Sequence, residues 1–256
     1  MNSELLIRSF KDFLSPKIIM TSVTSLIITV FIVLFGLYFA FDGFGGLKDE
    51  ILLVIQSENW LFLEGLKENF IIDFLIKHAI FSFVLNFLFL MGFGLIIYYI
   101  FFMIYSFVIG FFSIVIIKDL QSKYYEDIRL DGISIGSSIW FYIKTVLITV
   151  VLFILLLPFY FIPILNLVIF LPMYYFFHKT LVFDVSSIIN STQEYQQIKA
   201  LNWGSLKVKT FVLFLVALVP IVGIILYPFY ILFIGHFIFS KTKTIREVGV
   251  EKISIV

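Results

Sequence analysis

The 256-residue chain contains no cysteine and few charged residues. Without cysteine it forms no disulfide and has no thiol to serve as nucleophile, redox centre or metal ligand. Asp, Glu, Lys and Arg make up 14% of the sequence, whereas a soluble domain carries about 25%. The formal net charge is +1. That balance argues against a nucleic-acid partner, because proteins that bind nucleic acid gather positive charge to contact phosphates.

Catalytic and nucleotide-binding motifs are also missing. The sequence has no H-E-x-x-H zinc motif, G-x-S-x-G nucleophile elbow, P-loop or dinucleotide-binding glycine pattern. His78, His178 and His236 each lie beside the end of an apolar run, and we interpret them as interfacial residues rather than metal ligands. Asp184 is interpreted as a solvated or helix-capping acid rather than a proton-coupling group. We therefore expect no enzyme activity, no catalytic residue, no cofactor and no bound metal.

The sequence is instead rich in apolar runs. Hydrophobic residues make up 61% of the chain, and some uncharged runs exceed the roughly 18 residues that indicate a membrane-spanning helix. Residues 18–41 would form ~36 Å of helix, enough to cross a ~30 Å hydrocarbon core. Residues 1–17 place spaced apolar side chains on one helical face. This pattern predicts a short helix on the membrane surface, although a frayed tail fits the same residues.

Residues 78–125 are predicted to form one long second membrane helix. Its uncharged run is too short for two comfortable spans and a turn. Lysine and arginine are concentrated in four segments of the chain. These are the N-terminal segment, residues 118–144, which begin where the uncharged run ends, residues 179–209 and the tail 241–256. The positive-inside rule puts all four in the cytoplasm and the acid-rich, partly amphipathic segment 42–77 outside. A single crossing through 78–125 satisfies this arrangement, whereas two crossings would put residues 118–144 outside.

Two further apolar blocks, residues 133–179 and 205–240, leave the cytoplasm and return to it. In the second block only ten residues separate Lys209 from Pro220, which is ~15 Å of helix and about half of a span. This length predicts a re-entrant helical hairpin rather than one crossing or two. The outgoing arm of the first block is longer and could nearly span the membrane.

The two blocks share a pattern. "IPILNLVIFLPMYYFFH" (162–178) and "VPIVGIILYPFYILFIGH" (219–236) each contain an aliphatic residue and proline, a turn-forming residue three positions later, a second proline, aromatic residues and a final histidine. This pattern is typical of an internal repeat, a common way to build transporters. The match is short, and chance similarity is the alternative.

The predicted hairpin tips are candidate anion-binding sites. Buried lysine or arginine is expensive in lipid, and none lies in the middle of an apolar run. Pro163 and Pro220 suit the first turns of the return arms, where free N–H groups and the positive helix ends would point into the membrane. Asn166 could donate a side-chain N–H, and Gly223 would let an anion approach the backbone. Alternatively, the prolines only shape the turns.

Three features of the sequence resemble the CysZ sulfate-permease family, which includes the etoposide-induced membrane proteins. They are the long second helix running into "GFFSIVIIKDLQSKYYEDI", the paired I/V-P-x-x-N/G hairpins, and "LVFD" after the first hairpin. The similarity covers most of residues 10–240 in order and spacing. It implies an all-α integral membrane protein with two long transmembrane helices and two partly inserted hairpins, forming homo-oligomers in the bacterial inner membrane. It also implies sulfate uptake for cysteine synthesis. Members of this family carry a pair of basic residues near the start of the first span. This chain has one basic residue there, Lys17, which is a further candidate anion ligand.

We therefore expect a multi-pass permease or channel of the bacterial inner (plasma) membrane, with both termini in the cytoplasm. Its expected partners are sulfate or a related small oxyanion, the lipid bilayer and further copies of the same chain, with no nucleic acid. The alternative is a non-transporting membrane scaffold or assembly protein that uses its hairpins to bind partners or shape the bilayer. A lipid-modifying enzyme ranks third, because polar catalytic clusters are missing.

Overall fold

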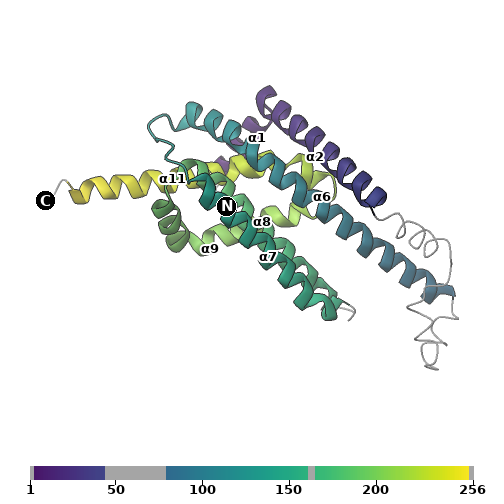
Figure 1. Ribbon diagram of the computed structural model, residues 1–256. Helices are drawn as coiled ribbons and strands as arrows, with labels where there is room; N and C mark the ends of the chain where they lie inside the picture. Colours follow the sequence, from purple (N-terminus) through teal and green to yellow (C-terminus); the bar gives the residue numbers. More distant parts are fainter. Residues whose placement is uncertain (1–2, 44–78, 161–164, 254–256) are drawn as a thin grey trace. The chain divides into compact units, whose positions relative to one another are not determined.

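A computed structural model describes residues 3–43, 79–160 and 165–253 (Figure 1). These residues form helices and turns, with no strand among them. The chain divides into two compact units, residues 1–27 together with 105–256, and residues 28–104. The predicted external segment 42–77 lies outside the described residues from position 44 onwards.

Within the described residues, five helices are long and apolar enough to cross a membrane. They are α2 (Pro16–Gly43), α6 (Ala79–Tyr124), α7 (Ile135–Tyr160), α8 (Phe170–Ile189) and α9 (Thr192–Ala217). The predicted all-α membrane protein is confirmed, and the two long helices α2 and α6 coincide closely with the predicted spans 18–41 and 78–125. The partial insertion of the hairpins stays a prediction.

The two predicted hairpins have the same order of elements. In the first, α7 is followed by the short 3-10 helix η1 (Leu165–Ile169) and then by α8. In the second, α9 is followed by the four-residue α10 (Val222–Ile225) and then by α11 (Tyr227–Ile253). Each pair of long helices is thus joined through a short helical turn, as the repeated pattern predicts.

The helices extend beyond the predicted hairpin bounds of 133–179 and 205–240. α8 continues ten residues past Lys179, α9 begins at Thr192, and α11 runs on to Ile253. The start of α9 is fixed by a capping box, in which the Ser191 hydroxyl accepts from the Glu194 N–H and the Glu194 carboxylate accepts from the Ser191 N–H. Lysines at the apolar boundary do not end these helices, because an α-helix satisfies its own backbone in water as well as in lipid.

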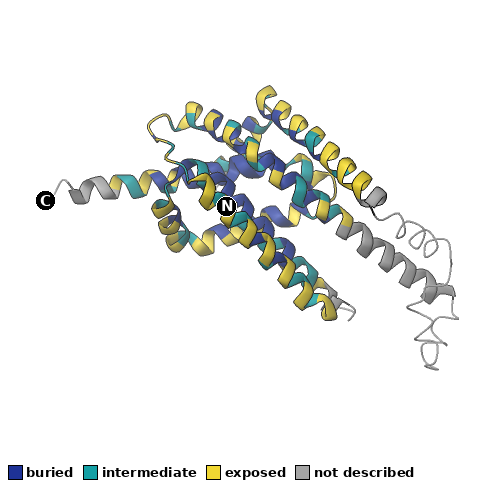
Figure 2. Cartoon of the chain, viewed as in Figure 1, coloured by how far each residue is buried: buried dark blue, intermediate teal, exposed yellow. Residues whose placement is uncertain are grey.

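α11 is the centre of the larger unit. It packs against α1 (Ser3–Phe13), α8 and α9, and Figure 2 shows its central part as buried. Its side chains from Tyr230 to Ile234 are at most 1% exposed. The predicted surface helix α1 contacts this core directly, since Phe10 and Phe13 both pack edge-on against Phe229. α1 is therefore docked on the protein, while Ile7 remains 69% exposed on its outer face.

α6 and α11 approach each other closely at Gly235. A Cβ atom added at this glycine would lie 2.8 Å from Leu120 Cδ2 and 3.1 Å from Ile117 Cδ1. Both partner side chains are fully buried and have little room to move. Only glycine allows the two helices to pack at this distance.

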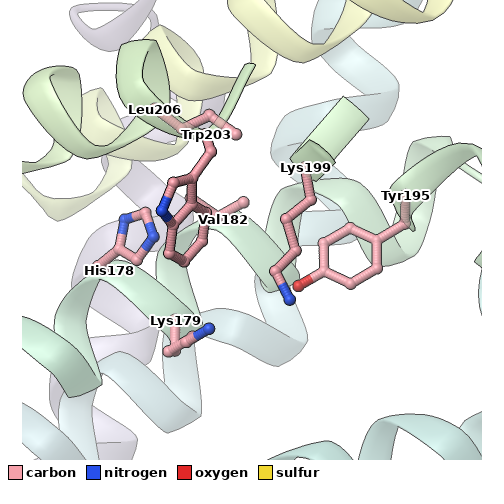
Figure 3. A pocket seen from close by; sticks show the side chains of 7 residues that line it. All are labelled: His178, Lys179, Val182, Tyr195, Lys199, Trp203 and Leu206. Carbon is pink, nitrogen blue, oxygen red and sulfur yellow. The ribbon is translucent and has the colours of Figure 1, made fainter. Parts of the chain in front are cut away.

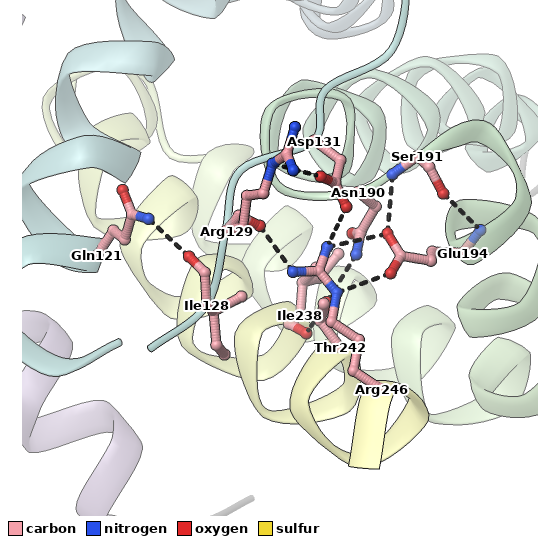
Figure 4. Close-up of polar contacts among 10 residues, drawn as sticks. All are labelled: Gln121, Ile128, Arg129, Asp131, Asn190, Ser191, Glu194, Ile238, Thr242 and Arg246. Carbon is pink, nitrogen blue, oxygen red and sulfur yellow. Dashed lines mark hydrogen bonds and ion pairs between the residues drawn. The ribbon is translucent and has the colours of Figure 1, made fainter. Parts of the chain in front are cut away.

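Arg246 joins three segments at the far end of α11 (Figure 4). Its guanidinium donates to both carboxylate oxygens of Glu194 on α9, at 2.7 and 3.1 Å, and to Asp131 Oδ2 at 2.7 Å. It also donates to the Arg129 carbonyl at 2.8 Å. The hydrogen bond to Glu194 raises the pKa of the Arg246 guanidinium above its usual value. Arg246 therefore holds α9 and the segment between α6 and α7 against α11.

We expect Arg246→Gln to lower the free energy of unfolding by about 2 kcal/mol, because it leaves Glu194 without its charged donor and leaves Asp131 with Arg129 alone. Denaturant titration of the detergent-solubilised protein measures the change. Lys243→Gln is the matched control, since Lys243 pairs with Asp127 at 2.8 Å where both side chains are about half exposed. We expect that exposed pair to contribute little to stability, because solvent screens it. Equal losses in the two variants would contradict the role given to Arg246.

Candidate functional site

The turn between α9 and α11 contains two of the residues predicted to bind an anion. Pro220 is exposed, and Gly223 is buried within α10. The Pro220 carbonyl accepts a 2.8 Å hydrogen bond from the Val222 N–H, and Ile221 between them has φ 69° and ψ −52°. This is a γ-turn with positive φ, a rare and strained conformation for a β-branched residue. The Gly223 N–H donates to the Val219 carbonyl at 3.0 Å and is therefore not free for a ligand.

The prolines that begin the return helices are not the two expected. Pro172 is the third residue of α8 and Pro228 is the second residue of α11. Both lie in a first helical turn, where the missing N–H does no harm. Pro220 instead lies in the turn before α10, and Pro163 lies outside the described residues. The second proline of each repeated pattern therefore lies in the first turn of α8 or α11, and the role expected of Pro163 stays a prediction.

The other two predicted anion ligands belong to other elements. Asn166 belongs to η1. Lys17 lies at the start of α2, and its ammonium donates to Asp119 Oδ1 at 3.0 Å. Asp119 also pairs with Lys123 at 2.6 Å. Lys17 thus shares a carboxylate with a second lysine rather than presenting its charge alone.

Asp184 is buried, which corrects the expectation of a solvated or capping acid. Asp184 is a residue of α8 and is 2% exposed. The Tyr142 hydroxyl on α7 donates to Asp184 Oδ1, and Oδ2 has no hydrogen-bond partner among the described residues. A Cβ atom at Gly110 on α6 would lie 3.2 Å from Oδ2. α8 continues past Asp184 and carries the carboxylate into the packing between α6 and α7. Its immediate neighbours in the sequence, Phe183 and Val185, are apolar, but they do not show which helices bury the carboxylate.

A second group of polar side chains lines a pocket between α8 and α9 (Figure 3). The side chain of Trp203 lies at its centre, with Lys207 Nζ 4.5 Å, Lys179 Nζ 5.1 Å and Lys199 Nζ 5.7 Å from its ring. We call Trp203 and these three lysines the cationic pocket. The hollow itself is lined by Lys179, Lys199 and Trp203 together with His178, Val182, Tyr195 and Leu206. Lys207 lies beside the Trp203 ring and is not part of the lining.

The cationic pocket was not predicted from the sequence, although a signal for part of it was there. Lys199, Trp203 and Lys207 are spaced four residues apart, which would place them on one face of a regular helix. In the structure α9 is kinked at Asn202, between Lys199 and Trp203. Lys179 comes from the neighbouring helix and could join them only through the packing of α8 on α9. The pocket has about 220 Å³ of empty space that is open to solvent.

No group of three His, Asp or Glu side chains in the described part of the chain is placed to share a metal ion. His178 is instead engaged within the protein, because its Nδ1 lies 2.7 Å from the Thr210 hydroxyl and its ring packs against Trp203.

Comparison with known proteins gives one match. The sequence profile of the family described as "Sulfate transporter CysZ/Etoposide-induced protein 2.4" matches residues 5–228. No curated protein and no solved structure matches the chain significantly. The matched residues run from α1 to the first turn of α11 and include both hairpin turns.

Proposed function

Because the chain belongs to the sulfate transporter CysZ/etoposide-induced protein 2.4 family, we propose that it is a membrane permease or channel that carries a small oxyanion, with sulfate as its substrate. The family match carries this proposal, since it covers most of the chain and all five candidate membrane helices. No nucleotide-binding motif is present in the sequence. The driving force is therefore an ion gradient, the membrane potential or the gradient of the anion itself.

The proposed site of anion passage is the pair of hairpin turns. The strained γ-turn at Ile221 supports this proposal, because strained backbone persists only where the surrounding structure enforces it and is common at functional sites. In this proposal Asn166 donates its side-chain N–H to the anion, and Pro163, Pro220 and Gly223 shape the two turns. Lys17, at the start of α2, has a secondary role through its positive charge, which Asp119 on α6 partly neutralises.

Binding at the turns is tested by Asn166→Leu. Losing one hydrogen bond to a charged ligand is worth about 1.5–3 kcal/mol, so we expect sulfate affinity to fall about tenfold to a hundredfold. Sulfate-dependent thermal stabilisation of the purified protein, at constant ionic strength, measures this affinity. Asn166→Gln keeps an amide donor and should restore part of the response. If the Leu variant responds to sulfate like the wild type, Asn166 does not contact the anion.

The membrane arrangement in this proposal puts both termini and the loop between the hairpins in the cytoplasm of a bacterial cell, with the protein assembled as a homo-oligomer. Because the chain has no native cysteine, single cysteines report exposure cleanly. We expect Glu64→Cys to react with an impermeant thiol reagent from outside, and Lys123→Cys, Gln193→Cys and Lys243→Cys to react only from inside. Labelling of Gln193→Cys from outside would contradict the paired re-entrant hairpins.

A further inference from the structure

The cationic pocket brings together three lysines without an acidic partner. None of the ion pairs formed within the described residues involves Lys179, Lys199 or Lys207. We propose that this pocket binds a doubly charged tetrahedral oxyanion, either free in solution, as sulfate or phosphate, or as the phosphate headgroup of an anionic lipid.

The first support for this site is the closeness of the three charges. Each Nζ lies within 5.7 Å of the Trp203 ring centroid, so no two of them are more than twice that distance apart. This upper bound is somewhat longer than the screening length of about 8 Å at physiological ionic strength, so repulsion between the ammonium groups is only partly screened. The indole face offsets part of this repulsion through cation–π attraction. A dianion among the three would replace the repulsion with charge-assisted hydrogen bonds.

The second support is the accessibility and size of the pocket. Lys179 and Lys199 are half-buried and Lys207 is exposed, so a ligand can enter from solvent and still lose part of its hydration. The space inside the pocket is small and open to solvent. This suits a small ion or a headgroup held at its mouth rather than a larger ligand enclosed within it. Tyr195 adds a hydroxyl group to the lining.

A second group of lysines, beside Phe237, can be compared with the cationic pocket. Lys209 and Lys241 lie 4.6 and 5.7 Å from the ring of Phe237. Only two lysines meet there, and Lys209 Nζ also donates to the Ser205 hydroxyl at 2.8 Å. These residues provide a control in which two charges beside an aromatic ring are removed without touching the cationic pocket.

Trp203 is a reporter for the test. With Trp60→Phe and Trp140→Phe, the protein has Trp203 as its single tryptophan. In nanodiscs of phosphatidylcholine, we expect sulfate and phosphate to change its fluorescence saturably at constant ionic strength, and chloride to leave it unchanged. Lys199→Gln with Lys207→Gln should weaken this binding at least about tenfold, whereas Lys209→Gln with Lys241→Gln should change it less than about twofold.

A second set of measurements, with anionic lipid in the nanodiscs, distinguishes a free oxyanion from a lipid headgroup. If a headgroup is the ligand, the same fluorescence change appears when phosphatidic acid is included in the nanodiscs, and added sulfate then has no further effect. No saturable change with free anions or with phosphatidic acid would overturn the site, as would equal losses in the two double-lysine variants. Because binding is measured without transport, a protein that binds here but moves no sulfate would refute the proposed function and leave this site standing.

Discussion

Gly235→Leu is expected to lower the free energy of unfolding by about 3 kcal/mol, the upper end of the usual effect of overpacking a core. A Cβ atom alone would approach Leu120 Cδ2 to 2.8 Å, and leucine adds three further carbons. Since Leu120 and Ile117 are fully buried, α6 and α11 must separate to admit the new side chain. Gly235→Ala should have a smaller effect in the same direction.

Unfolding in mixed detergent micelles, followed by circular dichroism, measures this change. The control is Gly136→Leu in the first turn of α7, where nothing lies within 4 Å of an added Cβ atom. We expect that variant to be as stable as the wild type. If Gly235→Leu is also neutral, α6 and α11 are not packed at the distance described.

The second large effect is expected at the buried carboxylate. Tyr142→Phe removes the described donor to Asp184 and should lower the free energy of unfolding by about 1–3 kcal/mol, the penalty for a buried polar group left unsatisfied. The phenyl ring itself is retained, so packing against Phe107 and Phe183 persists. The loss therefore reports the hydrogen bond rather than a cavity.

A double variant distinguishes the hydrogen bond from a general weakening of the core. Replacing both partners by apolar groups of similar shape is often nearly neutral, so Tyr142→Phe with Asp184→Leu should recover most of the lost stability. Tyr38→Phe, at a tyrosine that is 64% exposed, should have no effect. If the double variant is less stable than Tyr142→Phe alone, Asp184 has interactions beyond Tyr142 that the carboxylate must maintain.

The helices could be predicted from the sequence because their signal is local. Long uncharged runs gave α2 and α6 to within a few residues, and the repeated proline pattern anticipated two similar helix–turn–helix pairs. The helices α8, α9 and α11 continue past the predicted hairpin bounds, because those bounds followed the lysines beside the apolar blocks. α9 is kinked at Asn202, close to the predicted hairpin start at residue 205. A capping residue such as Ser191 is a better signal of a helix start than a change in hydropathy.

The polar sites were harder to predict, because they depend on which helices pack together. Asp184 follows an apolar run in the sequence, and only the packing of α8 against α6 and α7 buries it. The cationic pocket likewise needs Lys179 from α8 beside Lys199 and Lys207 from α9. A single sequence gives the helical face of each lysine but not the neighbour that this face meets.

The central claim is that the protein carries sulfate across a membrane. It is tested most directly by the uptake of radiolabelled sulfate into liposomes that contain the purified protein, compared with protein-free liposomes of the same lipid. We predict uptake that saturates with external sulfate and is reduced by unlabelled sulfate but not by chloride at the same ionic strength. Uptake no faster than in protein-free liposomes, by protein whose unfolding transition shows that it is folded, would contradict the claim.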